Sequence, residues 1–134
     1  RLNELFVKKY SDVALVRVQN PVQLDDYSEP QPDLALLHRQ ADFYTSGHPT
    51  PADVFLLVEV TESLAAYDRR LKTPLYARSG IQELWLVDLE QQSVTVYRDA
   101  TARGYRSTRV LRRGEQLAPL AFPDRPVAVG EILG

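Results

Sequence analysis

The pattern of apolar and polar positions divides the chain into short strands and two helices. The apolar spacing in "LNELFVKKY", residues 2–10, is typical of a short amphipathic helix. β-Branched and apolar residues concentrate in residues 13–19, 33–38 and 54–60, which we interpret as three strands. Residues 39–53, between the second and third of these strands, contain one glycine and two prolines and are expected to form a loop.

A second helix is predicted after the third strand. Ser63 suits the N-cap, apolar positions follow at helical spacing as far as Leu75, and Gly80 suits the position that follows the last turn. Pro74 removes a backbone donor, so we expect it to kink or split this helix.

The second half of the chain is predicted to consist mainly of strands. Residues 83–89, 93–99 and 105–112 are separated by short turns and indicate a meander of hairpins. Residues 119–134, which hold three prolines, are expected to be extended and loop-like. The order of helix, three strands, helix and three strands indicates an α/β (α+β) fold with a helix packed on a sheet. The 134 residues suit a single domain, residues 1–134.

Composition narrows the class of protein. With 44% apolar and 25% charged residues the chain is typical of a soluble globular protein, and no apolar run approaches the ~20 residues of a membrane span. The absence of cysteine excludes disulfides and thiolate metal sites, and a cytoplasmic protein is the natural interpretation. The chain starts at Arg1 and contains no Met, so we expect its natural start to be missing.

Charge is uneven along the chain. The net charge of −2 provides no global attraction to nucleic acid. Residues 98–113 nevertheless hold six arginines against one aspartate, and "DRRLK", residues 68–72, is a second basic cluster. Both clusters are explained either as solvated surface or as a rim that faces phosphates.

Glu59 is the first candidate functional residue. It follows Val54–Val58, a run of five apolar residues that reads as a strand buried on both faces. A buried ionised carboxylate is costly unless it is paired with a cation or binds a metal. An arginine such as Arg70 is one possible partner.

Asp33 is the second candidate. If the strands at 33–38 and 54–60 form an antiparallel hairpin with His38 opposite Val54, Asp33 lies opposite Glu59. Two carboxylates about 5 Å apart repel one another, and a divalent cation between them reverses that interaction. Mg²⁺ (or Mn²⁺) suits such oxygen ligands, and the carbonyl of Val60 offers another. The alternative is that Asp33 merely caps its strand.

Lys72 is the third candidate, on the helix that follows. It either forms an i,i+4 ion pair with Asp68 or points back to the mouth of the hairpin. In the second case its ammonium group is able to orient a water or stabilise charge on a phosphate.

Several short motifs in this order resemble the Uma2 family, endonucleases of the PD-(D/E)XK restriction-endonuclease-like superfamily. The resemblance runs from about residue 13 to the C-terminus. The motifs that carry it are Pro32-Asp33, Glu59-Val60, the spacing Asp68-x-x-x-Lys72-x-x-x-Tyr76, and "GIQELWLVD", residues 80–88.

The resemblance implies a restriction-endonuclease-like mixed central sheet flanked by helices, with the antiparallel acidic hairpin at its active edge. It implies that Asp33 and Glu59 are metal ligands and that Lys72 is the catalytic lysine. The superfamily motif places a lysine two residues after the acid, where this chain has Thr61, but Uma2-like proteins supply it from the next helix. Uma2-like chains are also longer at the N-terminus, so the domain is expected to be N-terminally incomplete.

The resulting hypothesis is an Mg²⁺-dependent endonuclease that hydrolyses DNA phosphodiester bonds. Double-strand cleavage would suggest a homodimer. The alternatives are a catalytically inactive domain of the same fold that binds nucleic acid or protein, and a structural domain whose acid pair is held by arginines. The arginines predicted to contact the DNA backbone are Arg69, Arg70, Arg106 and Arg109.

Overall fold

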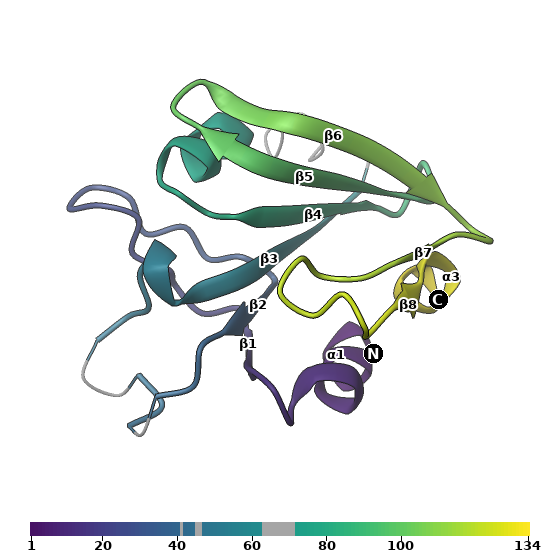
Figure 1. Ribbon diagram of the computed structural model, residues 1–134, viewed down its shortest axis with the longest axis horizontal. Coiled ribbons are helices and arrows are strands. Elements are labelled where there is room, and N and C mark those ends of the chain that lie inside the picture. The colour runs from purple at the N-terminus through teal and green to yellow at the C-terminus, as the bar shows by residue number, and fades with distance from the viewer. Residues whose placement is uncertain (41, 45–46, 63–71) are drawn as a thin grey trace.

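The structure, a computed structural model, describes residues 1–40, 42–44, 47–62 and 72–134 (Figure 1). Its centre is a six-stranded sheet in which the strands lie side by side in chain order. Only β3 and β4 run parallel among these neighbours, and the other four pairs are antiparallel. The predicted mixed sheet is therefore confirmed. The strands are β1 (Leu15–Val18), β2 (Leu34–Leu37), β3 (Val54–Thr61), β4 (Glu83–Asp88), β5 (Ser93–Thr101) and β6 (Gly104–Arg112).

The acidic hairpin lies inside the sheet rather than along its side. Strands β2 and β3 are the second and third of the six, because β1 pairs with the outer side of β2. The outer strands are β1 and β6. The predicted active edge therefore corresponds to one end of the strands, where β2 begins and β3 finishes.

The C-terminal segment contains more regular structure than the sequence predicts. The expectation that residues 119–134 are loop-like is wrong for their last part, where β8 (Val127–Ala128) pairs with β7 (Gln116–Leu117) and leads into α3 (Val129–Leu133). The side chain of Glu131 accepts a hydrogen bond from the N–H of Ala128 and so caps this helix. None of the helices in the described residues is long and apolar enough to span a membrane.

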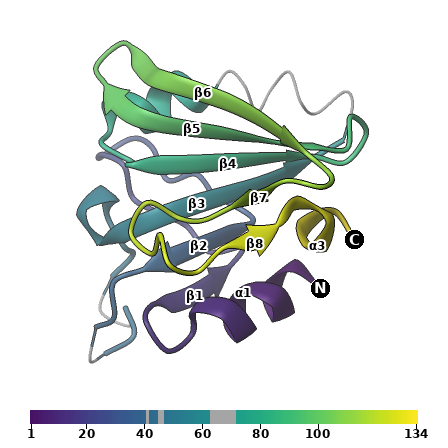
Figure 2. The ribbon, with the colours of Figure 1, turned by 45° about the vertical axis from the view of Figure 1, so that its right-hand side comes forward.

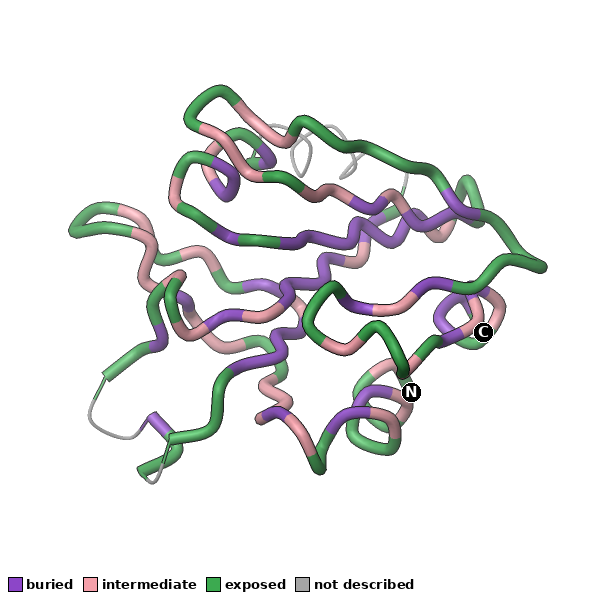
Figure 3. The backbone as a smooth tube through the Cα atoms, in the orientation of Figure 1, coloured by how far each residue is buried: buried purple, intermediate pink, exposed green. Residues whose placement is uncertain are grey.

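Each face of the sheet is covered by different elements. α1 (Leu2–Tyr10), the predicted first helix, lies with α3 and the β7–β8 segment over one face, which we call the α1/α3 face (Figure 2). Its core contains Phe6, Trp85 and Ile132. The other face packs against the helix formed by residues 72–78, and we call it the crossover face. Its core contains Tyr76, Leu57 and Leu84. Burial is accordingly concentrated in the central strands (Figure 3).

α1 is tied to the C-terminal segment by polar contacts. Arg125 donates from both guanidinium ends to the Asp12 carboxylate, over 2.6 and 2.8 Å, and this contact holds the pKa of Asp12 below its usual range. The Tyr10 hydroxyl donates to the carbonyl of Arg125 at 3.0 Å. The two ends of the described chain therefore close over the same face of the sheet.

The β2–β3 hairpin forms as predicted, with one correction to its register. Leu34 lies opposite Val58, as the sequence predicts. The predicted His38–Val54 pair is wrong, because a bulge immediately before Leu37 places Leu37 opposite Val54. A bulge adds one residue to one strand and so shifts the pairing on one side of it only.

The second predicted helix is described from residue 72 onward, and its predicted N-cap, Ser63, lies outside the described residues. Residues 72–78 are helical through Pro74, so this proline does not end the helix within that segment. Gly80 has a φ of +91°, the left-handed conformation predicted for the residue that follows the helix. Because β3 and β4 are parallel, this helix belongs to the crossover that joins them.

Glu83, at the start of β4, is a fully buried carboxylate on the α1/α3 face. Its side chain is 0% exposed and forms an ion pair of 2.7 Å with Arg98, whose side chain is 33% exposed. The Trp85 indole N–H and the Leu120 backbone N–H each donate to Glu83 at 2.8 Å. Three donors therefore compensate for the desolvation of this acid.

We predict that Glu83→Gln lowers the free energy of unfolding by about 3–5 kcal/mol, because the amide group places donors against donors and leaves a partly buried arginine unpaired. The matched control is Asp99→Asn, since Asp99 is 61% exposed and its ion pair with Arg106 spans 4.0 Å. That change is expected to cost less than about 1 kcal/mol. Urea unfolding measures both, and equal losses would contradict a structural role for Glu83.

Candidate functional site

Asp33 and Glu59 come together where β2 begins and β3 approaches its carboxyl end. Continuing the observed register by one pair beyond Leu34–Val58 places Asp33 opposite Glu59, as predicted. Residues opposite one another in an antiparallel pair have Cβ atoms about 5 Å apart, and their side chains share one face. That face is the crossover face, because Leu57, two residues before Glu59, belongs to its core.

Asp33 is held by the backbone of the neighbouring strand. Its Oδ2 accepts a hydrogen bond from the Val60 N–H at 2.7 Å. The N–H and C=O of one strand residue point to the same side, so the Val60 carbonyl is also directed toward the start of β2. The next residue in register is Pro32, which has no N–H to donate to that carbonyl. A carboxylate and a backbone carbonyl are thus directed to the same place.

Glu59 is almost completely buried, at 2% exposed. Its Oε2 accepts a hydrogen bond from the Tyr76 hydroxyl at 3.2 Å, and Tyr76 is 0% exposed. The sequence indicated only helix–sheet packing for Tyr76. The one signal in the sequence that could have found this contact is its position, four residues after Lys72 on the same helix. The helix therefore contributes to the acid pair directly, through a buried phenol.

Lys72 lies on the same side of the helix as Tyr76, one turn earlier. A crossover helix between parallel strands runs antiparallel to them, so Lys72 lies about 6 Å from Tyr76 toward the carboxyl end of β3. Lys72 is exposed and has no hydrogen bond or ion pair within the described part of the chain. The structure brings it to the correct end of the sheet but shows no contact with either acid. Asp68, its predicted ion-pair partner, lies outside the described residues.

Thr61 occupies the position two residues after Glu59 where the superfamily motif places its lysine. Its side chain is 3% exposed, and its hydroxyl donates to the carbonyl of Glu62 at 3.3 Å. A threonine cannot supply a cation at this position. Any positive charge provided by the described residues near the acid pair must therefore come from another element.

Of the arginines predicted to contact DNA, the structure assigns Arg109 to a face of the sheet. Arg109 lies directly opposite Val96, which belongs to the core of the α1/α3 face. Tyr105, the neighbour of Arg106 on β6, packs against the core of the crossover face, and Asp99 across from Arg106 has a φ of +60°. The alternation of side chains is therefore interrupted here and does not assign Arg106 to a face. Two further predicted contacts lie outside the described residues: Arg69 and Arg70.

The oxygen ligands at this end of β3 suit a hard divalent cation. Asp33, Glu59 and the Val60 carbonyl supply carboxylate and carbonyl oxygens, which Mg²⁺ and Mn²⁺ prefer, with waters completing the coordination. Among the described residues no group of three or more His, Cys, Asp or Glu side chains could hold a metal ion. The two carboxylates and the Val60 carbonyl are therefore the oxygen atoms that could hold a divalent cation at this end of β3.

Comparisons with known proteins bear on the family and the fold of the chain. The model of the family Uma2, described as "Putative restriction endonuclease", matches residues 1–130. The crystal structure of a "putative nuclease belonging to DUF820" from Anabaena variabilis superposes with a TM-score of 0.69 at 16% sequence identity, covering 98% of this chain and 74% of that chain. No curated protein matches the chain. At this low identity the superposition shows a shared fold.

We predict that Tyr76→Phe lowers the free energy of unfolding by about 1–3 kcal/mol, because a buried carboxylate loses one of its donors. Tyr27→Phe is the matched control, since the Tyr27 side chain is 96% exposed. It should change stability by less than about 0.5 kcal/mol. Chemical denaturation of both variants tests this, and an unchanged midpoint for Tyr76→Phe would mean that the phenol does not stabilise Glu59.

Proposed function

Because the chain belongs to the Uma2 family, we propose that it is a metal-dependent endonuclease that hydrolyses phosphodiester bonds in DNA. The observation that carries this proposal is Glu59, an acid buried at 2% exposure beside Asp33 on the same face of the sheet. A structural acid such as Glu83 is surrounded by donors and an arginine. Glu59 accepts a hydrogen bond from Tyr76 and has a second carboxylate, Asp33, opposite it in the register of the hairpin.

In this proposal Asp33, Glu59 and the Val60 carbonyl hold Mg²⁺, or Mn²⁺ in its place. The ion would supply Lewis-acid polarisation of the scissile phosphate and lower the pKa of a water. The hydrogen bonds from Val60 to Asp33 and from Tyr76 to Glu59 fix both carboxylates in advance. Preorganised ligands of this kind avoid a reorganisation cost when substrate arrives.

Lys72 is proposed to stabilise the negative charge that develops on the phosphate or to orient the attacking water. Its exposure and its position toward the carboxyl end of β3 support this role. A lysine side chain is long and flexible, so its ammonium group is able to approach a substrate that lies over the acids. The cation then comes from the helix rather than from the position of Thr61.

Backbone contacts to DNA are proposed for Arg69, Arg70 and Arg106, which add affinity without reading sequence. Arg109 projects from the opposite face, so it would reach the same DNA only around the outer side of β6. Cleavage of both strands requires two active sites, which a homodimer would provide.

A second candidate is a catalytically inactive domain that binds nucleic acid or protein. The observation that favours it is that this chain differs from the superfamily motif at two positions near Asp33 and Glu59. Thr61 replaces the usual lysine, and Lys72 makes no contact with Asp33 or Glu59. Binding of DNA without cleavage would distinguish this candidate from the endonuclease.

We predict that Mn²⁺ raises the melting temperature of the wild type and that Asp33→Asn removes the shift. An ion at 100 times its Kd stabilises the folded state by about 2.7 kcal/mol. Asn keeps an oxygen acceptor for the Val60 N–H, so the variant should remain folded while losing the ionised ligand. Asp26→Asn, at an exposed position, is the control and should keep the full shift. A shift that survives Asp33→Asn would remove Asp33 from the metal site.

We predict that the protein nicks supercoiled plasmid DNA with Mg²⁺ or Mn²⁺ and that EDTA stops the reaction. Glu59→Gln and Lys72→Ala should each lower the rate by about 10²–10³-fold, the loss typical of removing one stabilising group. Lys8→Ala is the control, since Lys8 is an exposed residue of α1 on the opposite face. If wild type and Glu59→Gln give the same background, the endonuclease proposal fails.

A further inference from the structure

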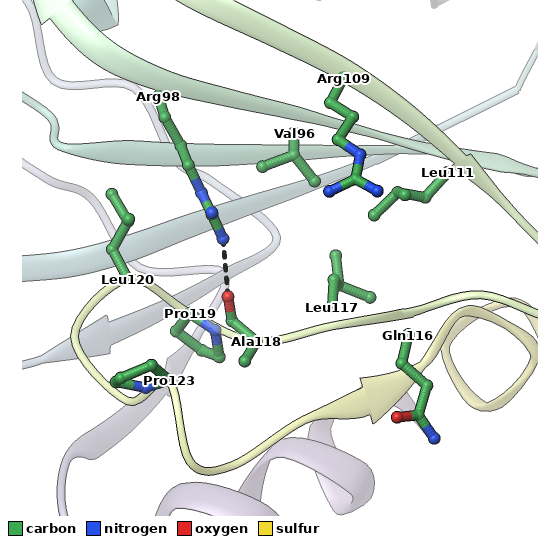
Figure 4. Close-up of a pocket in the computed structure, with 10 residues that line it drawn as sticks. All are labelled: Val96, Arg98, Arg109, Leu111, Gln116, Leu117, Ala118, Pro119, Leu120 and Pro123. Atoms are coloured by element: carbon green, nitrogen blue, oxygen red, sulfur yellow. Dashed lines mark hydrogen bonds between the residues drawn. The ribbon is translucent and has the colours of Figure 1, made fainter.

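A pocket of about 300 Å³ lies on the α1/α3 face, between strands β5 and β6 and the segment 116–123 (Figure 4). Cavities that bind small molecules usually begin at about this volume. Its strand residues come from β5 and β6, and the opposite wall is β7 with the proline-rich turn that follows it. The pocket is on the other face of the sheet from Asp33 and Glu59, so it does not belong to the candidate active site.

The pocket has a mixed lining, in which apolar side chains from both walls lie beside Arg98, Arg109 and Gln116. Val96, Leu111 and Leu117 are at most 7% exposed and form part of the core of this face. Pro119 and Pro123 line the opposite wall and add rigid apolar surface without N–H donors. These residues offer a small apolar surface against which a compact apolar group of a ligand could pack.

Arg98 is one of two cations at the pocket, and its charge is already balanced. Its Nε donates to Glu83 at 2.7 Å and its Nη2 donates to the carbonyl of Ala118 at 2.7 Å (Figure 4). These contacts fix the guanidinium plane against the wall. Arg98 therefore forms part of the pocket wall, and its positive charge is largely neutralised by Glu83.

Arg109 is the second cation, and nothing balances it. It has no hydrogen bond or ion pair among the residues that the structure describes. In Figure 4 its guanidinium lies over the pocket, between Val96 and Leu111 and above Leu117. Within the described part of the chain, the exposed Arg109 thus offers its charge to the pocket without a protein partner.

We infer that this pocket binds a small organic carboxylate with a compact apolar body, such as an aromatic ring. The carboxylate accepts two parallel hydrogen bonds from the Arg109 guanidinium, the geometry that this group favours. The apolar body fills the space above Leu117. This site is independent of the proposed nuclease activity, because its residues lie on the opposite face from the acids.

Arg106 provides the comparison that separates a ligand contact from ordinary surface charge. Charged residues on an outer strand deter pairing with other chains, and the three arginines of β6 serve that purpose. Arg106 forms an ion pair with Asp99 and does not line this pocket. Only Arg109 lies over a pocket, so a ligand of this class should depend on Arg109 and be indifferent to Arg106.

The test titrates the wild type with 3-phenylpropionate, followed by calorimetry and by backbone amide shifts. We expect a Kd of about 1 mM, which corresponds to about −4.1 kcal/mol, with shifts confined to β5, β6 and residues 116–123. The neutral 3-phenylpropionamide and acetate should each bind at least tenfold more weakly. Equal binding of the amide, or shifts centred elsewhere, would overturn the inference.

Variants supply the second part of the test. Arg109→Gln should weaken 3-phenylpropionate binding at least tenfold without changing the melting temperature, whereas Arg106→Gln should leave the affinity unchanged. A peptide that ends in phenylalanine with a free carboxylate is the third probe. If that peptide binds and 3-phenylpropionate does not, the occupant is a chain end and the small-molecule inference is wrong. Unchanged affinity in Arg109→Gln would overturn it as well.

Discussion

The structure is organised around the burial of Glu59 in the apolar centre of a six-stranded sheet. An ionised carboxylate is stable there only if neighbouring elements supply donors or a cation. The crossover helix supplies Tyr76, and the start of β2 places Asp33 beside the same position. The position of Glu59 therefore depends on the order of the strands, on the direction of the crossover helix and on the packing of the crossover face.

Burial alone does not distinguish a functional acid from a structural one. Glu83 is more completely buried than Glu59, yet an indole, a guanidinium and a backbone N–H surround it. Its interactions tie β4 to β5 and to the C-terminal segment, which closes the α1/α3 face. The two acids lie on opposite faces of adjacent parallel strands. One stabilises the scaffold, and the other occupies the position where chemistry is proposed.

The sequence predicted the strands and the opposition of Asp33 and Glu59 because apolar runs define both strands of the hairpin. The sequence did not predict the features that depend on tertiary contacts. α3 is only five residues long and contains Gly130, so it carries no clear helical period. The Tyr76 contact depends on the packing of a helix on a sheet.

The bulge before Leu37 also affects how far the length of the loop between β2 and β3 can change. A one-residue slip in a strand normally exchanges its two faces and would carry Asp33 away from Glu59. Here the extra residue is Phe55 in β3, and the pairs from Leu36–Leu56 to Leu34–Val58 keep their phase. Residues 38–53 are thereby uncoupled from the acid pair. Insertions and deletions there are free to accumulate during evolution while the two carboxylates stay aligned.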